Sequence, residues 1–441
     1  MTRDRRGVAV PTGRFQRAVS LGSVVGGIAI NSIGKSVAQR LRGEEADLRA
    51  VALTAENAGK LASQLATMRG AAMKLGQLLS MEVGDVIPAE FASALAILRY
   101  QADPMPPRQV RQVLTRAWGR DWLKQFKRFD AKPMAAASIG QVHRGIHKDG
   151  REMAFKVQFP GVRDGIDHDI DNVGSIIRVS GMLPKDFELR PFLDEAKAQL
   201  KRETDYGEEA HNLERFAKAL SGSNQFSIPR MHADYSTNKV LAMDFVPSDP
   251  IESVVDLPQV QRDALITDLF SLLFMELFEL RLIQSDPNPG NYRYDRTRSR
   301  IVLLDFGAVQ TISPELSENL KALLVAGRDL NREAIEHAAS RIGYIDEHTT
   351  PPQKALVLDA LALACTPLRS AEPYDFSNSN LTIELAEIGN RLGFDAGYRT
   401  VPPMEVLYLH RKFAGVFLLA KQFKARVDFQ SIASPYLDGS R

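Results

Sequence analysis

The hydrophobic pattern of the chain changes its period near residue 134, and this change limits the folds that the chain can adopt. Before it, apolar side chains recur at alternating spacings of four and three, as one face of a helix requires. These positions are Leu61, Leu65, Met68, Ala72, Leu75 and Leu79. After it, "SIGQVHRGIH", the turn "KDG" and "REMAFKVQF" predict a β-hairpin.

Further along, the pattern alternates again. A polar helical stretch is predicted over residues 191 to 218, and "KVLAMDFVP" predicts a short apolar strand that Pro247 ends. The segment "DALITDLFSLLFMELFELRLI" is apolar nearly all round, as expected for a central helix. The predicted order is helices, a small β-rich part and a larger helical part, which is an α+β fold.

Four segments follow from these patterns. Residues 1–50 form a basic and apolar N-terminal segment, and residues 51–130 form a helical extension with a last short helix to about Phe126. Residues 131–247 form the β-rich lobe, and residues 248–441 form the helical lobe.

Composition excludes several classes of function. The 56 Lys and Arg residues nearly balance the 54 Asp and Glu residues, so no global positive field predicts binding to nucleic acid. The single cysteine, Cys365, excludes an internal disulfide and a thiolate-cluster zinc site, and the 8 His residues show no metal-ligand spacing.

The N-terminal segment is basic and then apolar. Five arginines and one acid occur in the first 20 residues, and an apolar run from Leu21 ends before Lys35. This run is shorter than the about 20 apolar residues that span a bilayer, and it lacks an A-x-A-like cleavage site. Peripheral contact with a membrane and a loosely docked terminus remain two alternatives. The predicted location is the cytoplasm, with the membrane surface as the alternative.

Two carboxylates and an amide in the helical lobe have the spacing of a phosphoryl-transfer site. In "SDPNPGN", Asp286 and Asn291 are five residues apart, and Asp305 opens the triplet D-F-G 14 residues later. The kinase catalytic loop H-R-D-x-x-x-x-N has this separation and precedes D-F-G. Asp286 would lie near the attacking oxygen, while Asn291 and Asp305 would hold Mg²⁺. A turn-rich loop with a chance triplet is the alternative, but order and spacing together favour the site. Gln284 and Ser285 stand where kinases have His and Arg.

The β-rich lobe carries residues that suit nucleotide phosphates. Lys156 in "MAFKV" occupies the place of the lysine in the kinase motif V-A-I-K. Where a Gly-rich loop would cover the phosphates, the chain has Ala135, Ala136 and Ala137, followed by Ser138. Because alanine resists positive φ, this loop should be stiffer than a glycine loop.

These motifs together resemble the UbiB/AarF/ADCK family of atypical, protein-kinase-like proteins. The resemblance covers about residues 60 to 425. It rests on "KLGQ" at 74–77, "AAASIGQVH" at 135–143, "MAFKVQFPGV" at 153–162, "ETDYGEEAHN" at 203–212, "SDPNPGN" and "LLDFG". It implies a two-lobed kinase-like fold, with the helical extension packed over the nucleotide site. It also implies binding of adenine nucleotide (ATP or ADP) with Mg²⁺ and a role in the biosynthesis of isoprenoid quinones such as ubiquinone.

The resemblance also implies roles for individual residues. Lys156 would grip the phosphates with Glu209 as its helix partner. Lys74 and Gln77 would form the K-x-G-Q pair, and Glu203 and Asp205 the E-x-D pair. The segment "LAMDFVP" would link the lobes, with Met243 behind the adenine and the backbone of Asp244, Phe245 and Val246 at the base edge.

The expected function is Mg²⁺-dependent ATP hydrolysis or γ-phosphate transfer in support of quinone metabolism. Only five residues separate D-F-G from "SPEL", and no A-P-E motif is found, which disfavours a peptide substrate. Two rival hypotheses stay open. One is phosphorylation of a lipid or quinone-like phenol with Asp286 as base, and the other is a nucleotide-gated lipid chaperone or scaffold that does not hydrolyse ATP. Contact with a biosynthetic complex and a homodimer also stay open.

Overall fold

The computed structural model describes residues 104–137, 139–179, 189–286, 288–398, 400 and 402–439. The chain divides into two compact units. Unit 1 is Met1–Glu214 with Arg230–Phe245, and unit 2 is Arg215–Pro229 with Val246–Arg441. The predicted N-terminal segment and most of the helical extension, including Lys74 and Gln77, lie outside the described residues.

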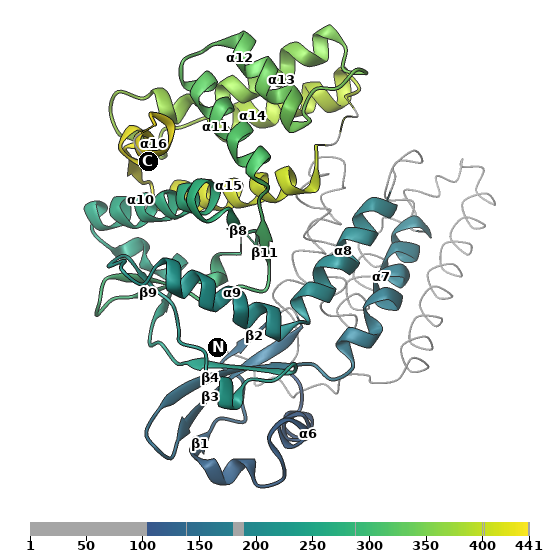
Figure 1. Ribbon diagram of the computed structural model, residues 1–441, viewed down its shortest axis with the longest axis vertical. Helices are drawn as coiled ribbons and strands as arrows, with labels where there is room; N and C mark the ends of the chain where they lie inside the picture. Colours follow the sequence, from purple (N-terminus) through teal and green to yellow (C-terminus); the bar gives the residue numbers. More distant parts are fainter. Residues whose placement is uncertain are drawn as a thin grey trace, which may run out of the picture. The chain divides into compact units, whose positions relative to one another are not determined.

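Unit 1 is built on an antiparallel sheet (Figure 1). Its strands follow the order β1-β3-β4-β6, and β2 pairs with β3. Their bounds are β1 Phe126–Phe129, β2 Ala135–Ala136, β3 Gly140–His147, β4 Glu152–Gln158 and β6 Val240–Asp244. The predicted hairpin is therefore present as β3 and β4, and its turn ends at Gly150 with a φ of 97°, which glycine adopts readily.

The prediction of helix over the last residues of 51–130 is wrong. Helix α6 spans Pro107–Trp118 and ends at Gly119, whose φ is 87°. A 3₁₀ turn, η1 (Trp122–Gln125), leads into strand β1. Aromatic side chains favour a strand when one face is buried, and Phe126 is buried against the sheet's core. Tertiary packing thus overrides the helical reading of this short segment.

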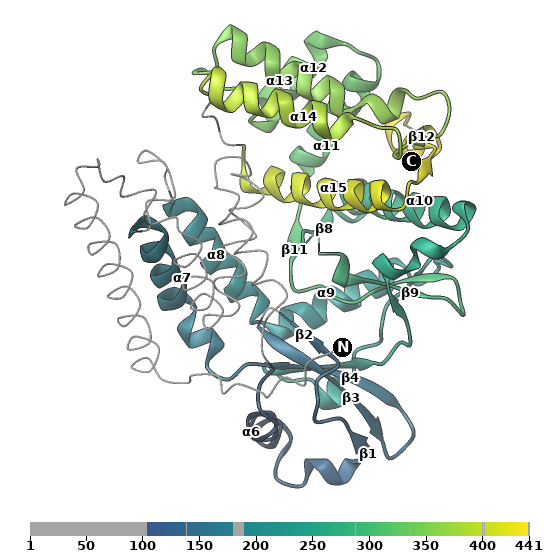
Figure 2. The same cartoon turned by 180° about the vertical axis from the view of Figure 1, so that it is seen from behind.

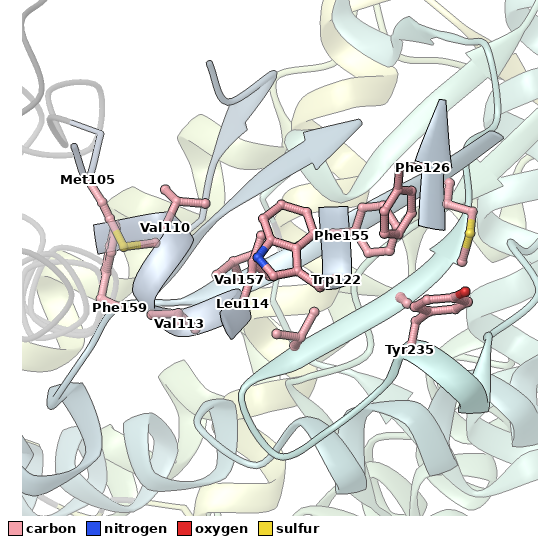
Figure 3. Packing of buried hydrophobic residues seen from close by; sticks show 13 residues of the cluster. Met105, Val110, Val113, Leu114, Trp122, Phe126, Phe155, Val157, Phe159 and Tyr235 are labelled. Atoms are coloured by element: carbon pink, nitrogen blue, oxygen red, sulfur yellow. The ribbon is translucent and has the colours of Figure 1, made fainter. Parts of the chain in front are cut away.

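The core of unit 1 is one aromatic and aliphatic cluster between the sheet and α6 (Figure 3). Trp118 is packed edge-on against Trp122, Phe155 and Tyr235, with ring centroids 5.2–5.7 Å apart. Met105, one residue before the proline-rich start of α6, is also buried in this cluster. The start of the described chain is therefore fixed to the sheet.

Three helices complete unit 1 or continue beyond it. They are α7 (Val162–Val179), α8 (Arg190–Glu203) and α9 (Tyr206–Ala219). Helices α7 and α8 lie side by side (Figure 1), joined by ion pairs from Asp171 to Lys197 and from Asp167 to Lys201. The predicted helical stretch over 191–218 is two helices, because Asp205 interrupts it and caps the second. Helix α9 begins in unit 1 and ends in unit 2.

Unit 2 contains the predicted central helix. Helix α10 (Gln259–Met275) continues as a π-helical turn, η4 (Glu276–Leu280), and ends at Arg281 with a φ of 50°. The strands that follow are β8 Leu282–Gln284, β9 Tyr292–Asp295, β10 Arg300–Leu303 and β11 Val309–Thr311. Strands β9 and β10 form a hairpin, β5 (Phe226–Ser227) lies parallel to β10, β7 (Asp249–Pro250) pairs with β9, and β8 pairs with β11.

The remainder of unit 2 is mainly helical. Its helices are α11 Pro314–Arg328, α12 Arg332–Ile342, α13 Pro351–Ala364, α14 Leu381–Asn390, α15 Met404–Gln422 and α16 Phe429–Leu437, with a small β12–β13 pair at Tyr374–Asp375 and Arg426–Val427. Helices α10 and α15 lie side by side (Figure 2), and α16 also contacts α10. The rings of Phe270, Phe376 and Phe429 pack at centroid distances of 4.7–6.1 Å.

The two units confirm the α+β prediction, with the larger sheet in unit 1 and mainly helices in unit 2. Within the described ranges, no helix has the length and apolar character needed to cross a membrane.

Candidate functional site

Lys156 lies inside strand β4 and is paired with a carboxylate. Its Nζ lies 2.7 Å from Oε1 and 2.9 Å from Oε2 of Glu209, which is in the first turn of α9. The side chains are 9% and 1% exposed, and the ring of Tyr206 lies 5.4 Å from the ammonium. Removing either partner of such a buried pair leaves an uncompensated charge. The structure thus brings together the two residues that the sequence analysis paired.

Strand register defines the face on which Lys156 lies. Directly opposite it are Val142 on β3 and Leu241 on β6. Two residues away along β4, Ala154 lies opposite Met243. Residues at these positions share one face of the sheet, because side chains alternate with a period of two. The sequence analysis named Met243 but missed Val142, Ala154 and Leu241, which strand alternation from Lys156 would have found.

The alanine segment pairs with strand β3. Ala135 and Ala136 form β2 opposite Val142 and Gln141, and the amide of Ala137 donates to the carbonyl of Gly140 at 2.9 Å. Both alanines of β2 are exposed, so their backbone and methyl groups are accessible to a ligand. Ser138 lies outside the described residues.

Gly140 permits a close approach of the chain at the base of this loop. A Cβ at this position would lie 2.5 Å from the carbonyl oxygen of Val157 and 2.9 Å from the hydroxyl of Tyr206. No real Cβ atom tolerates such distances, so only glycine fits. Tyr206 thus closes over Gly140 and lies beside Lys156, a role that the sequence did not indicate.

The segment predicted to meet the edge of the adenine base already makes hydrogen bonds within the protein. The carboxylate of Asp244 lies 2.7 Å from Nε2 of His232, and its amide donates to the carbonyl of Arg230. The amide of Phe245 donates to the carbonyl of Glu152. The amide donors of Asp244 and Phe245 are therefore used within unit 1, and Val246 is the first residue of this segment that belongs to unit 2.

The two acids of the E-x-D pair have different surroundings. Glu203 is the last residue of α8 and is buried. Asp205 caps α9, because its Oδ1 accepts from the amides of Gly207 and Glu208 at 3.1 Å each. Asp205 therefore has a local structural role that the sequence analysis did not consider.

In unit 2, a network of backbone and side-chain bonds joins the loop of Asp286 to the D-F-G segment. Asn291 Nδ2 donates to the carbonyl of Asp286 at 3.3 Å, and the carbonyl of Asn291 accepts from the amide of Leu304 at 3.1 Å. Both the amide and the hydroxyl of Ser285 donate to the carbonyl of Ala308, at 2.9 and 2.8 Å. These bonds hold Asp286, Asn291 and the residue before Asp305 in one local assembly.

The side chains of Asn291 and Asp305 suit Mg²⁺. Because the amide nitrogen of Asn291 is bonded to Asp286, its Oδ1 is the atom left for a cation. Asp305 uses Oδ1 to accept from the amide of Gly307 at 2.9 Å, which orients the carboxylate. No group of three or more His, Cys, Asp or Glu that could hold a metal occurs in the described part of the chain. Two hard oxygen ligands, completed by phosphates and water, match the usual protein contribution to a Mg²⁺ site.

A buried ion pair supports this loop. Lys412 Nζ on α15 lies 3.0 Å from Oε2 of Glu276, with the side chains 2% and 1% exposed. Burial alone would lower the pKa of Lys412, but the Glu276 carboxylate raises it above its ordinary value. The backbone of Gln284 also donates to the Glu276 carboxylate, and the ring of Tyr292 lies 5.5 Å from the ammonium. These four residues therefore link η4, α15 and both ends of the loop around Asp286.

The phenylalanine of the D-F-G triplet is fully packed. Phe306 is 1% exposed, and its ring centroid lies 5.0 Å from that of Phe216 near the end of α9. Helix α9 thus supplies Glu209 to the ion pair of unit 1 and Phe216 to the packing of unit 2.

Comparisons with known proteins show an atypical kinase-like domain. Residues 97–339 match the ABC1 atypical kinase-like domain. The chain is 32% identical to the mitochondrial atypical kinase coq-8 of Caenorhabditis elegans over 98% of this chain and 58% of that protein. It is 30% identical to the mitochondrial atypical kinase COQ8 of Saccharomyces cerevisiae over 95% of this chain and 84% of that protein. Among solved structures, the Rv3197–erythromycin complex from Mycobacterium tuberculosis is 26% identical, with a TM-score of 0.60, over 87% of this chain and 96% of that one.

Proposed function

The chain belongs to the ABC1 atypical kinase-like family, and from this membership we propose that it binds ATP with Mg²⁺ and hydrolyses it in support of isoprenoid quinone biosynthesis. Membership confirms the predicted kinase-like fold and the assignment as an atypical kinase. The relatives are named as the atypical kinases coq-8 and COQ8. The proposed pathway for this chain follows from that likeness.

The single observation that favours water over a peptide as acceptor is the short chain after D-F-G. Strand β11 (Val309–Thr311) is paired with β8, and α11 begins at Pro314, capped by Ser313. The segment from D-F-G to the next helix is thus six residues long, and half of it is fixed in a sheet. Protein kinases control activity through a longer activation segment between these points. This chain has little room for such a segment.

Each predicted residue has a proposed task. Lys156, oriented by Glu209, binds the phosphates, and the alanine loop covers them. Asn291 and Asp305 would hold Mg²⁺, which neutralises charge on the phosphates when bound. Asp286 orients the attacking water. We carry over from the family the helix of Lys74 and Gln77 that excludes larger substrates, and the E-x-D pair of Glu203 and Asp205.

The proposal assigns tasks to residues of both units. Support comes from the family match, because residues 97–339 include Lys156, Glu209, Asp286, Asn291 and Asp305. It also comes from the chemistry, since a phosphate-binding cation and a Mg²⁺-binding pair are the two halves that phosphoryl transfer needs.

The test is phosphate release from ATP by the full chain, with and without Mg²⁺. Asp286→Asn should reduce turnover by about 10²-fold or more, within the range of a lost general base, while ATP binding persists. Asp359→Asn, an exposed aspartate on α13, is the matched control and should leave turnover unchanged. Wild-type turnover that ignores Mg²⁺, or an Asp286→Asn variant as fast as the control, would contradict the proposal.

A second candidate is phosphorylation of a small molecule such as a quinone-like phenol or a lipid. It is favoured by the solved relative, which is a complex with the small molecule erythromycin. Adding prenylated phenols and searching for a phosphorylated product by mass spectrometry separates this activity from ATP hydrolysis. If Asp286→Asn complements normally in cells, the nucleotide-gated scaffold is the better hypothesis.

Location and assembly are proposals of the same kind. The COQ8 relatives are mitochondrial by name, and for this chain we propose the cytoplasm with peripheral membrane contact through the basic N-terminal residues. Flotation with liposomes should lose the protein when residues 1–40 are deleted. Sedimentation of the full chain distinguishes a monomer from a homodimer.

A further inference from the structure

Two polar side chains lie within the apolar core of unit 1. Gln141 and His143 are two residues apart on β3, so their side chains lie on the same face of the sheet. Both are at most 1% exposed. Their strand neighbours on β4 are Val157 and Phe155, which belong to the hydrophobic cluster. A buried polar group costs free energy unless it is hydrogen-bonded, so this pair requires an explanation.

The pair forms one continuous hydrogen-bond chain. His143 Nδ1 lies 2.8 Å from the carbonyl oxygen of Asp130, and its Nε2 lies 2.8 Å from Nε2 of Gln141. Gln141 Oε1 in turn accepts from the amide of Met105 at 2.6 Å. The imidazole also stacks on the ring of Phe129, with centroids 5.5 Å apart. The chain therefore connects the start of α6, strand β3 and the end of β1.

Only one protonation pattern satisfies every contact. The carbonyl of Asp130 can only accept, so Nδ1 carries the proton and Nε2 is the acceptor for the Gln141 amide. If His143 were protonated, its Nε2–H would face the Gln141 NH₂ group. Rotating the Gln141 amide would instead place its NH₂ group against the backbone N–H of Met105. In either orientation, two hydrogen-bond donors would therefore face each other.

Burial also keeps His143 neutral. It lowers the pKa of His143, while the carbonyl and carboxylate of Asp130 oppose the shift. The charged group that acts on the imidazole among the described residues is this carboxylate, which is ion-paired with Arg128 at 2.7 Å. Phe129 on β1 and Phe155 on β4 face the imidazole ring. Met105 lies at the other end of the hydrogen-bond chain, beyond Gln141.

The hydrogen-bond chain acts at the base of the alanine loop. Gln141 is the register partner of Ala136 in β2 on one side and of Val157 in β4 on the other. Its side chain faces the core, whereas Val142 and Lys156 face the opposite side of the sheet. Gln141 and His143 therefore do not share the face of Lys156, but they fix the strand from which the alanine loop extends.

We propose that Gln141 and His143 are positioning residues that hold the alanine loop in its nucleotide-binding position through a chain of directed hydrogen bonds. The inference rests on the proposed function, because nucleotide is taken as the ligand of that loop. Two apolar side chains could fill the same space. They would make no directional hydrogen bonds, however, and so would not fix the register of the loop. Loss of these hydrogen bonds should weaken nucleotide binding, although every side chain on the sheet face of Lys156 stays in place.

Gln141→Glu tests this with a pH signature. The carboxylate still accepts from the Met105 amide, but it has no donor for neutral His143. Protonated His143 can donate to it, so the new pair raises the pKa of His143. The chain of bonds is then complete below that pKa and broken above it. At pH 8, Gln141→Glu should bind ATP roughly 5- to 10-fold more weakly than wild type does, which is the cost of one unsatisfied buried group. Its affinity should approach that of wild type as the pH falls to 6.

Two controls separate this from general damage. Gln112→Glu makes the same charge change at an exposed position of α6 in unit 1 and should track wild type at every pH. His143→Asn keeps a donor for the Asp130 carbonyl but loses the acceptor for Gln141, so it should bind ATP weakly with no recovery at pH 6. Calorimetric titration of the full chain with ATP and Mg²⁺ measures all four proteins.

The outcomes are distinguishable. If wild type fails to bind ATP, the proposed function is wrong. If wild type binds and Gln141→Glu matches it at both pH values, the positioning role is wrong. Independently of any ligand or variant, ¹⁵N NMR of the wild-type imidazole should show His143 neutral with its proton on Nδ1 at pH 7. A proton on Nε2, or a charged ring, would overturn the inference even if a variant fails to fold.

Discussion

The Lys412–Glu276 ion pair beneath the Asp286 loop allows a prediction of defined size. Lys412 Nζ lies 3.2 and 3.0 Å from the two carboxylate oxygens, and neither side chain is more than 2% exposed. Lys412→Met fills most of the same space but leaves the carboxylate unpaired. Breaking a buried pair in this way costs about 3–5 kcal/mol of unfolding free energy. For a domain of the size of unit 2, this corresponds to a fall in Tm of roughly 6–20 °C.

The loss should depend on pH. Burial raises the pKa of Glu276, and Lys412 opposes this shift. Without Lys412, the folded-state pKa of Glu276 rises further above its unfolded value. A carboxyl group with a raised folded pKa destabilises the protein when it is ionised, so the loss is full above that pKa. It shrinks as the pH falls through that pKa towards the unfolded value. Lys412→Met should therefore be closest to wild type in acid.

Thermal unfolding of the full chain between pH 5 and 8 measures both effects. Lys421→Met, an exposed lysine on the same helix, is the matched control and should shift Tm by little. The double variant Lys412→Met with Glu276→Gln should recover part of the loss, because it removes the buried charge. The reasoning would be refuted if Lys412→Met had the same Tm as the Lys421→Met control at pH 7.5. It would also be refuted if the loss of Tm relative to wild type grew as the pH fell.

Three further predictions follow from single contacts. Asp205→Asn should keep the cap of α9 and its stability, whereas Asp205→Ala should lose about 1 kcal/mol in denaturant titration; an Asn variant that is stable but inactive would assign the carboxylate a functional role. Gly140→Ala should weaken both folding and ATP binding, because its Cβ would lie 2.5 Å from the backbone oxygen of Val157; Tyr206→Phe in that background should not restore either, and full restoration would show that the hydroxyl contact alone matters. Burial raises the pKa of Cys365 to about 11, so a thiol reagent at pH 8 should label the native chain far more slowly than the denatured chain, and equal rates would contradict its burial.

The sequence predicted those parts that depend on local pattern and motif spacing. The β3–β4 hairpin and the apolar helix α10 follow from periodicity and turn residues. The pairing of Lys156 with Glu209 came from the family resemblance, since 53 residues separate the two and no local pattern joins them.

What the sequence missed depends on contacts between distant segments. Strand β1 forms because Phe126 is buried against β3 and β4, which a four-residue window cannot show. The Lys412–Glu276 pair joins residues 136 positions apart, although a lysine and a glutamate within apolar helices were visible signals. Asp205 was read only as a functional acid, but its position before α9 is also the usual place of an N-cap.

The most direct test of the central claim is a double-mutant cycle for ATP binding with Lys156→Met and Asp305→Asn, measured by calorimetry with and without Mg²⁺. If Lys156 binds the phosphates of ATP and Asp305 holds the Mg²⁺ that accompanies them, each variant should weaken binding in Mg²⁺, and the two effects should be non-additive by more than about 0.5 kcal/mol. Asp305→Asn should also remove most of the dependence on Mg²⁺. Wild-type binding that needs no Mg²⁺, together with two variants that bind as wild type does, would contradict the account.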